Sequence, residues 1–297
     1  MSLKNLFSSK KPVISFEIFP PNKASSINTI YKTIDNLAVL NPDYISVTYG
    51  AGGSLVDNKT IEIASIIKNQ YNIEPLAHLT CVTSTKKDIN YVLEKLQENN
   101  VENILALRGD LPEDDSFEFP NPLHFTYASD LINHIKNNKD FCIAAACYPE
   151  AHIDCKDLNT DLKNLKNKVD IGVDFLITQL FFDNKFYYDF EKRARALDIK
   201  TPIEVGIMPV VNKKQIERIV KLCGASLPEK FIKIMNKYEN NPEALKDAGI
   251  AYAVEQIVDL LSSGVSGIHI YTMNKPDIAK RIVDSIYSIV KAIERSN

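Results

Sequence analysis

The stretch Val13-Ile14-Ser15-Phe16-Glu17-Ile18-Phe19-Pro20-Pro21 predicts a short β-strand that two prolines end. β-branched and aromatic residues are enriched in strands, and proline cannot continue the hydrogen-bonded ladder. A doubly wound open sheet more often places a glycine-rich phosphate turn after its first strand. The Pro-Pro end therefore favours the other common α/β architecture, a closed barrel.

Seven further segments of this kind alternate with helical patterns along the chain. The expected strands are Val13–Phe19, Tyr44–Tyr49, Leu76–Val82, Asn103–Arg108, Cys142–Tyr148, Phe175–Phe182, Ile203–Met208 and Gly267–Met273. Between them apolar residues recur at helical spacing, as at Ile27, Ile30, Ile34 and Leu37. The last interval holds extra helical material from Leu227 to Leu261. The pattern predicts a single (β/α)8 TIM barrel domain over residues 1–297, with extra helical material before the last strand.

Composition excludes several classes of function. With 297 residues, of which 45% are hydrophobic, the chain can bury a large core. A net charge of −3 and the lack of a long basic run argue against nucleic acid as a partner. No apolar run reaches the roughly 18 residues of a membrane span, and the N-terminal residues do not resemble a signal peptide. The five cysteines lack CxxC spacing, so we expect reduced thiols in a cytoplasmic protein.

Glu17 is a carboxylate in the otherwise apolar first strand. Burying an ionised carboxylate costs free energy, so desolvation favours its protonated form. A protonated carboxyl near neutral pH is what a general acid requires. The alternative is an edge strand with Glu17 in solvent, and this segment alone does not decide between the two.

Polar side chains gather where the expected strands end, which is where barrel enzymes carry their chemistry. They are Glu17, Thr48, Tyr49, Gly50, Gly52, Gly53, His78, Thr80, Arg108, Gly109, Asp110, Tyr148, His152, Gln179, Gln215 and the run from Tyr271 to Lys275. Random placement would scatter such residues over both ends of the strands. The clustering therefore predicts an enzyme.

Taken singly, these residues also have ordinary structural explanations. The glycines from 50 to 53 could form only a tight turn. His78 could be a satisfied core histidine, and Arg108-Gly109-Asp110 a charged turn with a local ion pair. Gln179 is harder to explain in this way, because it lies on an apolar strand, where a buried amide needs partners. The conjunction supports a site, whereas no single residue does.

The residue types favour an organic cofactor over a metal. The five histidines are dispersed, and neither HExxH nor grouped carboxylates occur on one strand, so we expect no metal site. One acidic strand residue with aromatics, amides and a glycine-rich loop suits an organic cofactor better than metal-assisted hydrolysis.

In this order, the strand-end motifs resemble the methylenetetrahydrofolate reductase family, in its bacterial single-domain flavoenzyme form. The matching strings are SFEIFPP at 15–21, VTYGAGG at 47–53, HLTC at 78–81, ALRGD at 106–110, YASDL at 127–131, YPEAH at 148–152, ITQLFF at 177–182, GIMPV at 206–210 and HIYTMNK at 269–275. Each string is modest alone, but nine in register along eight strands span essentially the whole chain.

The resemblance implies a barrel that binds FAD non-covalently at the carboxyl ends of its strands. In the family, NAD(P)H reduces the flavin and leaves, and 5,10-methylenetetrahydrofolate replaces it and is reduced to 5-methyltetrahydrofolate, a methyl source for methionine synthesis. Family FAD positions carry over onto Thr48, His78, Arg108, Gly109, Asp110, Tyr127, Ala128, Tyr148, His152, Asp161 and Lys168. Folate positions carry over onto Glu17, Gln179, Gln215, Tyr271 and Lys275, with Asp110 shared.

The resemblance also gives Glu17 and Asp110 catalytic roles. Hydride cannot reach the methylene carbon of the folate until its five-membered ring opens, and protonation of the leaving nitrogen opens it to an iminium. Glu17 is the expected acid, and Asp110 is expected to stabilise the developing cation. Gln179 is expected to orient the pterin, while Lys168 and Arg108 hold polar portions of FAD.

Two features depart from the family pattern or have no assigned role. Lys275 stands where bacterial relatives carry arginine; lysine keeps the charge but loses the bidentate fork for a carboxylate. The acidic and aromatic loop Pro112–Leu123 has no assigned role.

Eukaryotic relatives carry a further regulatory domain that responds to S-adenosylmethionine. This chain ends after its eighth expected helix, so we expect that control to be absent.

Two other functional classes stay open at the level of sequence. A flavin-free barrel lyase or aldolase would use a lysine Schiff base, but no lysine lies inside an expected strand. A non-catalytic binding protein would require the strand-end residues to be inert. The resemblance favours NADH over NADPH as reductant and a homo-oligomer, although no residue identified here distinguishes the nicotinamides or fixes the subunit count.

Overall fold

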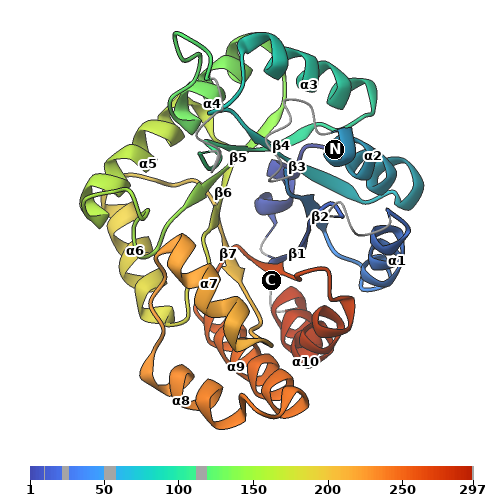
Figure 1. Cartoon of the computed structure of the whole chain (residues 1–297), viewed down its shortest axis with the longest axis vertical. Helices are drawn as coiled ribbons and strands as arrows, with labels where there is room; N and C mark the ends of the chain where they lie inside the picture. Colours follow the sequence, from blue (N-terminus) through green and yellow to red (C-terminus); the bar gives the residue numbers. More distant parts are fainter. Residues whose placement is uncertain (10, 22–26, 50–57, 112–118, 296–297) are drawn as a thin grey trace.

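Eight parallel strands close into a barrel at the centre of the molecule, and helices surround it (Figure 1). The computed structural model describes residues 1–9, 11–21, 27–49, 58–111 and 119–295. The strands pair in sequence order, and β8 closes onto β1. They are β1 (Val13–Ile18), β2 (Tyr44–Val47), β3 (Glu74–Thr80), β4 (Asn103–Leu107), β5 (Cys142–Cys147), β6 (Phe175–Thr178), β7 (Ile203–Ile207) and β8 (Gly267–Tyr271). The predicted TIM barrel is confirmed.

The outer layer consists of helices that connect successive strands. They are α1 (Ile27–Ala38), α2 (Asn58–Tyr71), α3 (Lys86–Glu98), α4 (Ala128–Asn138), α5 (Leu158–Gly172), α6 (Asn184–Ala196), α7 (Lys213–Cys223), α8 (Glu229–Tyr238), α9 (Pro242–Ser262) and α10 (Pro276–Arg295). The extra helical material before the last strand is confirmed as α8 and α9. In Figure 1, α8 lies at the outside of the molecule, whereas α9 takes a place in the ring and packs against α10 and α6.

All eight strands end earlier than the sequence pattern predicts. β6 stops at Thr178, although the apolar run continues to Phe182. Phe181 stacks on Tyr187 of α6 with ring centroids 6.0 Å apart, and Phe182 stacks on Phe231 of α8 at 5.0 Å. These residues are buried under helices without joining the sheet. An apolar run alone cannot distinguish a buried strand from a buried loop.

The strand β1 turns its two kinds of side chain to opposite sides. Phe16 and Ile18 lie in the apolar layer beneath the helices, whereas Ser15 and Glu17 face polar side chains inside the barrel. This follows from the two-residue period of a strand. The immediate neighbours of Glu17 are therefore polar, which differs from the expected apolar environment. The edge-strand alternative is wrong, because β1 pairs with both β2 and β8.

A short 3-10 helix, η1 (Leu3–Ser8), closes the amino-terminal end of the barrel. The backbone N–H of Leu3 donates to Oδ1 of Asn103 at 2.9 Å, and the ring of Phe7 lies 4.8 Å from that of Phe175. Leu3 belongs to an apolar cluster with interior residues of several strands. This end is thus filled, and the polar interior lies toward the carboxyl ends of the strands.

Candidate active site

Glu17 and two histidines form a close group inside the barrel. Oε2 of Glu17 lies 3.5 Å from Nε2 of His78 and 3.7 Å from Nε2 of His269. Glu17 is 19% exposed, while both histidines are buried. Strand register explains the meeting, because residue 15 on β1 pairs with His269 and residue 17 with Tyr271.

His78 is not a satisfied core histidine. Burial lowers its pKa from 6.5 to about 4, against the opposing influence of Glu17. Its ring is therefore neutral near pH 7. Its Nε2 is buried and has no hydrogen-bond partner among the described residues. An unpaired buried polar atom is costly, so this nitrogen indicates a ligand-facing position.

Tyr271 forms the wall beside this group. Its hydroxyl donates to the carbonyl oxygen of Thr178 at 2.7 Å, and its ring meets that of His269 edge-on at 5.2 Å. Gly206 on β7 leaves room for the ring, because an added Cβ would lie 2.7 Å from a ring carbon of Tyr271. Burial raises the pKa of the Tyr271 phenol. The side chain is therefore a neutral hydrogen-bond donor.

The end of β4 presents Arg108, Gly109 and Asp110. Gly109 has a φ of +85°, and an added Cβ would lie 2.8 Å from Cβ of Thr80. Nη2 of Arg108 pairs with Asp154 at 3.0 Å, so the expected local ion pair within this turn is not the one that forms. Asp110 is exposed.

The loop after β5 and the helix α5 bring together four predicted residues. The rings of Tyr148 and His152 meet edge-on at 4.7 Å, and the N–H of His152 donates to Asp161 at 3.2 Å. Nζ of Lys168 donates to the carbonyl oxygen of Ala146 at the end of β5 (2.7 Å). Burial lowers the pKa of Lys168, and Asp161 opposes that shift.

Three predicted residues lie closer to the rim. Thr48 follows β2, and its N–H donates to the carbonyl oxygen of Ile18 at 3.0 Å. Tyr127 is 61% exposed and precedes α4, where its N–H donates to Asp130 at 2.9 Å. Ala128 is the first residue of α4. The contacts of Thr48 and Tyr127 serve backbone and helix-capping roles, and contact of all three residues with a cofactor stays a prediction.

The expected folate residues occupy two places. The side-chain oxygen of Gln179 accepts from the N–H of Leu180 at 2.9 Å, so this amide has a local partner. Gln215 and Lys275 line one shallow groove with Met208 and Thr272, between α7 and the end of β8. The groove joins two predicted residues that are 60 positions apart in the sequence.

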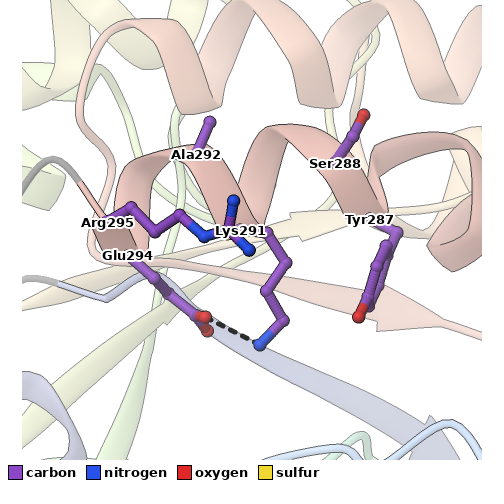
Figure 2. Close-up of a pocket in the computed structure, with 6 residues that line it drawn as sticks. All are labelled: Tyr287, Ser288, Lys291, Ala292, Glu294 and Arg295. Carbon is purple, nitrogen blue, oxygen red and sulfur yellow. Dashed lines mark hydrogen bonds and ion pairs between the residues drawn. The ribbon is translucent and has the colours of Figure 1, made fainter.

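A second hollow lies at the other end of the molecule, along the last turns of α10 (Figure 2). All six residues that line it come from this helix, and Lys291 pairs there with Glu294 at 2.7 Å. Glu294 also lies 3.7 Å from Lys11, which precedes β1. The hollow therefore belongs to the amino-terminal end of the barrel, away from the polar strand ends.

Some sequence features lie outside the described residues, namely the glycines from 50 to 53 and most of the loop 112–123. In the ranges that the structure describes, His, Cys, Asp and Glu form no group of three placed to hold a metal ion. No helix in the same ranges is long and apolar enough to cross a membrane.

Sequence reasoning missed a set of buried polar residues beneath Glu17. Ser15, Tyr44, Ser46, Glu204 and His269 are all buried. Ser15 could have been found from strand periodicity, because it shares a face with Glu17. Glu204 gave the same signal as Glu17, a carboxylate within the apolar strand β7.

Comparison with known proteins identifies the family. The family model described as methylenetetrahydrofolate reductase matches residues 2–287. This chain belongs to the methylenetetrahydrofolate reductase family. The reductases of this family are oxidoreductases, and the predicted resemblance is confirmed.

Curated methylenetetrahydrofolate reductases match over most of this chain. The 5,10-methylenetetrahydrofolate reductase of Escherichia coli is 34% identical over 273 residues, covering 92% of this chain and 90% of that protein. The Pectobacterium carotovorum enzyme of the same name is 34% identical, with 92% and 89% covered. The Arabidopsis thaliana protein named methylenetetrahydrofolate reductase (NADH) 1 is 35% identical. The match covers 92% of this chain but 48% of the plant protein, so the chain spans about half its length.

Solved structures with low sequence identity share the fold. A Clostridium thermocellum protein, described as binding two copies of 5-methyl-5,6,7,8-tetrahydrofolic acid, superposes over 100% of both chains with a TM-score of 0.64 and 15% identity. A Coxiella burnetii dihydropteroate synthase, solved with pteroic acid, gives a TM-score of 0.52 at 12% identity, with 94% and 93% covered. At these identities the likeness extends to the barrel fold alone.

Proposed function

We propose that this chain reduces 5,10-methylenetetrahydrofolate to 5-methyltetrahydrofolate with bound FAD, in a ping-pong reaction with NAD(P)H. The observation that carries the proposal is the position of Glu17. This chain belongs to the reductase family, and it holds the carboxyl of Glu17 near the carboxyl end of β1, beside two buried histidines. An acid is required there because the folate ring must be opened by protonation before it can be reduced.

The residues around the strand ends fit a flavin. The unpaired Nε2 of His78 needs a polar partner, and a flavin ring offers both acceptors and donors. Gly109 has a positive φ and no side chain, so the backbone at this position can approach a ligand closely. Lys168 and Arg108 are cations suited to the polar and pyrophosphate portions. When bound, FAD supplies the hydride that it has received from the nicotinamide.

Glu17 would hold a proton and give it to the leaving nitrogen of the folate. His78 is neutral because burial lowers its pKa to about 4. It therefore does not place a positive charge beside Glu17, which would favour the ionised carboxylate. The exposed carboxylate of Asp110 would stabilise the cation that ring opening creates.

The groove between α7 and β8 fits the tail of the substrate. Lys275 offers an ammonium and Gln215 an amide along the same groove. A folate carries a glutamate carboxylate at the end remote from its pterin, and lysine would contact it as a point charge. Gln179 and Tyr271, nearer the barrel centre, would orient the pterin.

Absorbance spectroscopy tests the proposal. The purified protein is expected to be yellow, to bleach when NADH is added anaerobically, and to recover its colour with methylenetetrahydrofolate. The same measurement with NADPH tests the expected preference for NADH. A colourless protein that fails to take up added FAD would overturn the proposal.

A flavin-free lyase or aldolase is the second candidate, and one observation favours it. A lysine must lose its proton to attack a carbonyl, and burial lowers the pKa of Lys168. Nζ of Lys168 instead donates to Ala146 from a helix outside the barrel. A protein without flavin that releases an aldehyde or ketone from its substrate would support this second reading.

Four accompanying expectations complete the proposal. The product would serve as a methyl donor for methionine synthesis. The chain would work in the cytoplasm as a homo-oligomer, as the resemblance to bacterial enzymes implies. That residues 1–297 form a single catalytic domain also stays a prediction. Subunit number is measured directly by analytical ultracentrifugation.

A further inference from the structure

A second carboxyl lies buried inside the barrel below Glu17. Glu204 on β7 is 0% exposed, and Ser15 and Tyr44 both donate to it. The interior of such barrels is usually filled by branched apolar side chains. A fully buried carboxyl is costly there even when it is hydrogen-bonded. Because a buried carboxyl is costly, stability alone does not explain why Glu204 occupies this core position.

Ser15 connects this carboxyl to His269. Its Oγ lies 2.6 Å from Oε1 of Glu204 and 2.6 Å from Nδ1 of His269. The opposite nitrogen of the same ring, Nε2, faces Glu17 at 3.7 Å and Ser46 at 3.4 Å. One serine and one imidazole thus form a continuous polar path from Glu204 to Glu17.

The single hydroxyl hydrogen of Ser15 permits two arrangements of this path. If Glu204 is ionised, Ser15 donates to it and accepts from Nδ1–H of a neutral His269. Nε2 then carries a lone pair toward Glu17 and favours its protonated form. If Glu204 is protonated, it donates to Ser15, Ser15 donates to Nδ1, and the resulting Nε2–H favours the carboxylate of Glu17.

We propose that Glu17 and Glu204 share one proton through His269 and Ser15. The two arrangements interconvert when three protons each move one place: Glu17 to Nε2, Nδ1 to Ser15, and Ser15 to Glu204. No atom or charge is gained or lost. The gap of 3.7 Å between Glu17 and Nε2 must close by about 1 Å for the transfer. Glu204 acts only through its neighbours and is therefore a positioning residue.

The groups that face Glu204 act on its pKa in opposite directions. Burial raises the pKa of Glu204, while Ser15, Tyr44 and His269 lower it and Asp43 raises it further. Burial also raises the pKa of Tyr44, so its phenol stays a donor. The folate reaction, which is the proposed function on which this step rests, uses the arrangement in which Glu204 is ionised and Glu17 holds the proton.

Infrared titration of the flavin-free protein tests the sharing without any catalysis. The carbonyl band of protonated Glu17 is assigned by its loss in Glu17→Gln. In Glu204→Gln, the pH midpoint of that band is expected to fall by about one unit or more, the coupling typical of interacting carboxyls. Removal of the buried negative charge and loss of the Nε2 lone pair both favour ionised Glu17.

Two further variants guard against a folding defect. Ser15→Ala keeps both carboxyls but breaks the path, so it should also lower the pH midpoint of the Glu17 band. The double variant, Ser15→Ala with Glu204→Gln, should lower that midpoint little further than either single variant. Tyr44→Phe removes one hydrogen bond to ionised Glu204 and should lower the Glu17 midpoint by less than Glu204→Gln does. Glu150→Gln is the control, since this half-buried carboxylate accepts from Ser226 instead, at 3.0 Å.

An unchanged Glu17 midpoint in folded Glu204→Gln and Ser15→Ala proteins would overturn the proposal. In the loaded enzyme, Glu204→Gln should shift the pH profile of the folate half-reaction by the same amount and leave flavin reduction by NADH unaltered. A shifted infrared midpoint in a protein that does not reduce folate would keep the proton sharing and reject the proposed function.

Discussion

Glu17 illustrates how the same residue can be identified from sequence for an incomplete reason. Its apolar neighbours along β1 point toward the helices, whereas its own face contains His78 and His269. That Glu17 donates a proton stays a prediction.

The variant Glu17→Gln keeps the size of the side chain but cannot donate the proton. Flavin reduction by NADH should proceed at nearly the wild-type rate, because it needs no such acid. Reoxidation by methylenetetrahydrofolate should fall by about 10²–10⁴-fold, the usual contribution of a general acid. Stopped-flow traces of the two half-reactions measure both rates, and Glu98→Gln, a change at an exposed residue of α3, serves as control. A folate half-reaction that stays intact would remove Glu17 from the mechanism.

Asp110→Asn should retain flavin and slow the folate half-reaction more than flavin reduction. A fixed negative charge helps most where positive charge develops, and only the folate forms a cation. Absorbance at the flavin band gives the cofactor content, and stopped-flow gives the two rates. Equal losses in both half-reactions would indicate that Asp110 has a structural role only.

At the scale of elements, the turn after β4 depends on a residue without a side chain. Gly109 combines a φ of +85° with a Cβ position only 2.8 Å from Thr80 on the neighbouring strand. Arg108, directly before this turn, pairs with Asp154 in the next loop, so the turn fixes part of the proposed flavin site.

Gly109→Ala and Gly264→Ala form a matched pair for this turn. Both glycines have positive φ, +85° and +82°, and alanine costs about 1–2 kcal/mol in that region. At Gly109 the added Cβ would also clash with Cβ of Thr80, at 2.8 Å, whereas nothing lies within 4 Å of the Cβ added at Gly264. Urea unfolding of the flavin-free proteins should therefore show a larger loss for Gly109→Ala. Equal losses would mean that Thr80 moves aside freely.

At the scale of the whole molecule, the barrel contains titratable groups that couple its stability to pH. His78 has a pKa of about 4 when folded, compared with 6.5 ordinarily. Between these values the unfolded chain binds a proton that the folded chain excludes. The contribution of His78 to stability is therefore present above about pH 6.5 and is lost as the pH falls toward 4.

His78→Gln should flatten this dependence. The loss attributable to His78 between pH 7 and pH 5 is about 2 kcal/mol in the free energy of unfolding, from the two pKa values. Urea unfolding of flavin-free protein at the two pH values measures it. His124→Gln, a change at an exposed histidine, should keep the wild-type dependence. If His78→Gln also keeps it, His78 is not the group responsible.

The sequence by itself determined the barrel, the family and the strand ends that carry polar residues. Strand and helix periodicities are local signals, and in a parallel barrel all strand ends of one kind lie on one face. Glu17, His78 and Tyr271 were identified in this way. The early end of β6 at Thr178 was not predicted, because an apolar run does not show whether its backbone is hydrogen-bonded to a neighbouring strand.

Only the tertiary structure decided what lies beneath Glu17. Ser15 contacts Glu204 and His269, which are 189 and 254 residues away in the sequence. Neither separation leaves a periodic signal, because the contacts are set by the registers in which β7 pairs with β8 and β8 closes onto β1. The sequence supplied the carboxyls and the imidazole. Closure of the barrel placed them on one path, since the side chains of paired strands meet across the same interior.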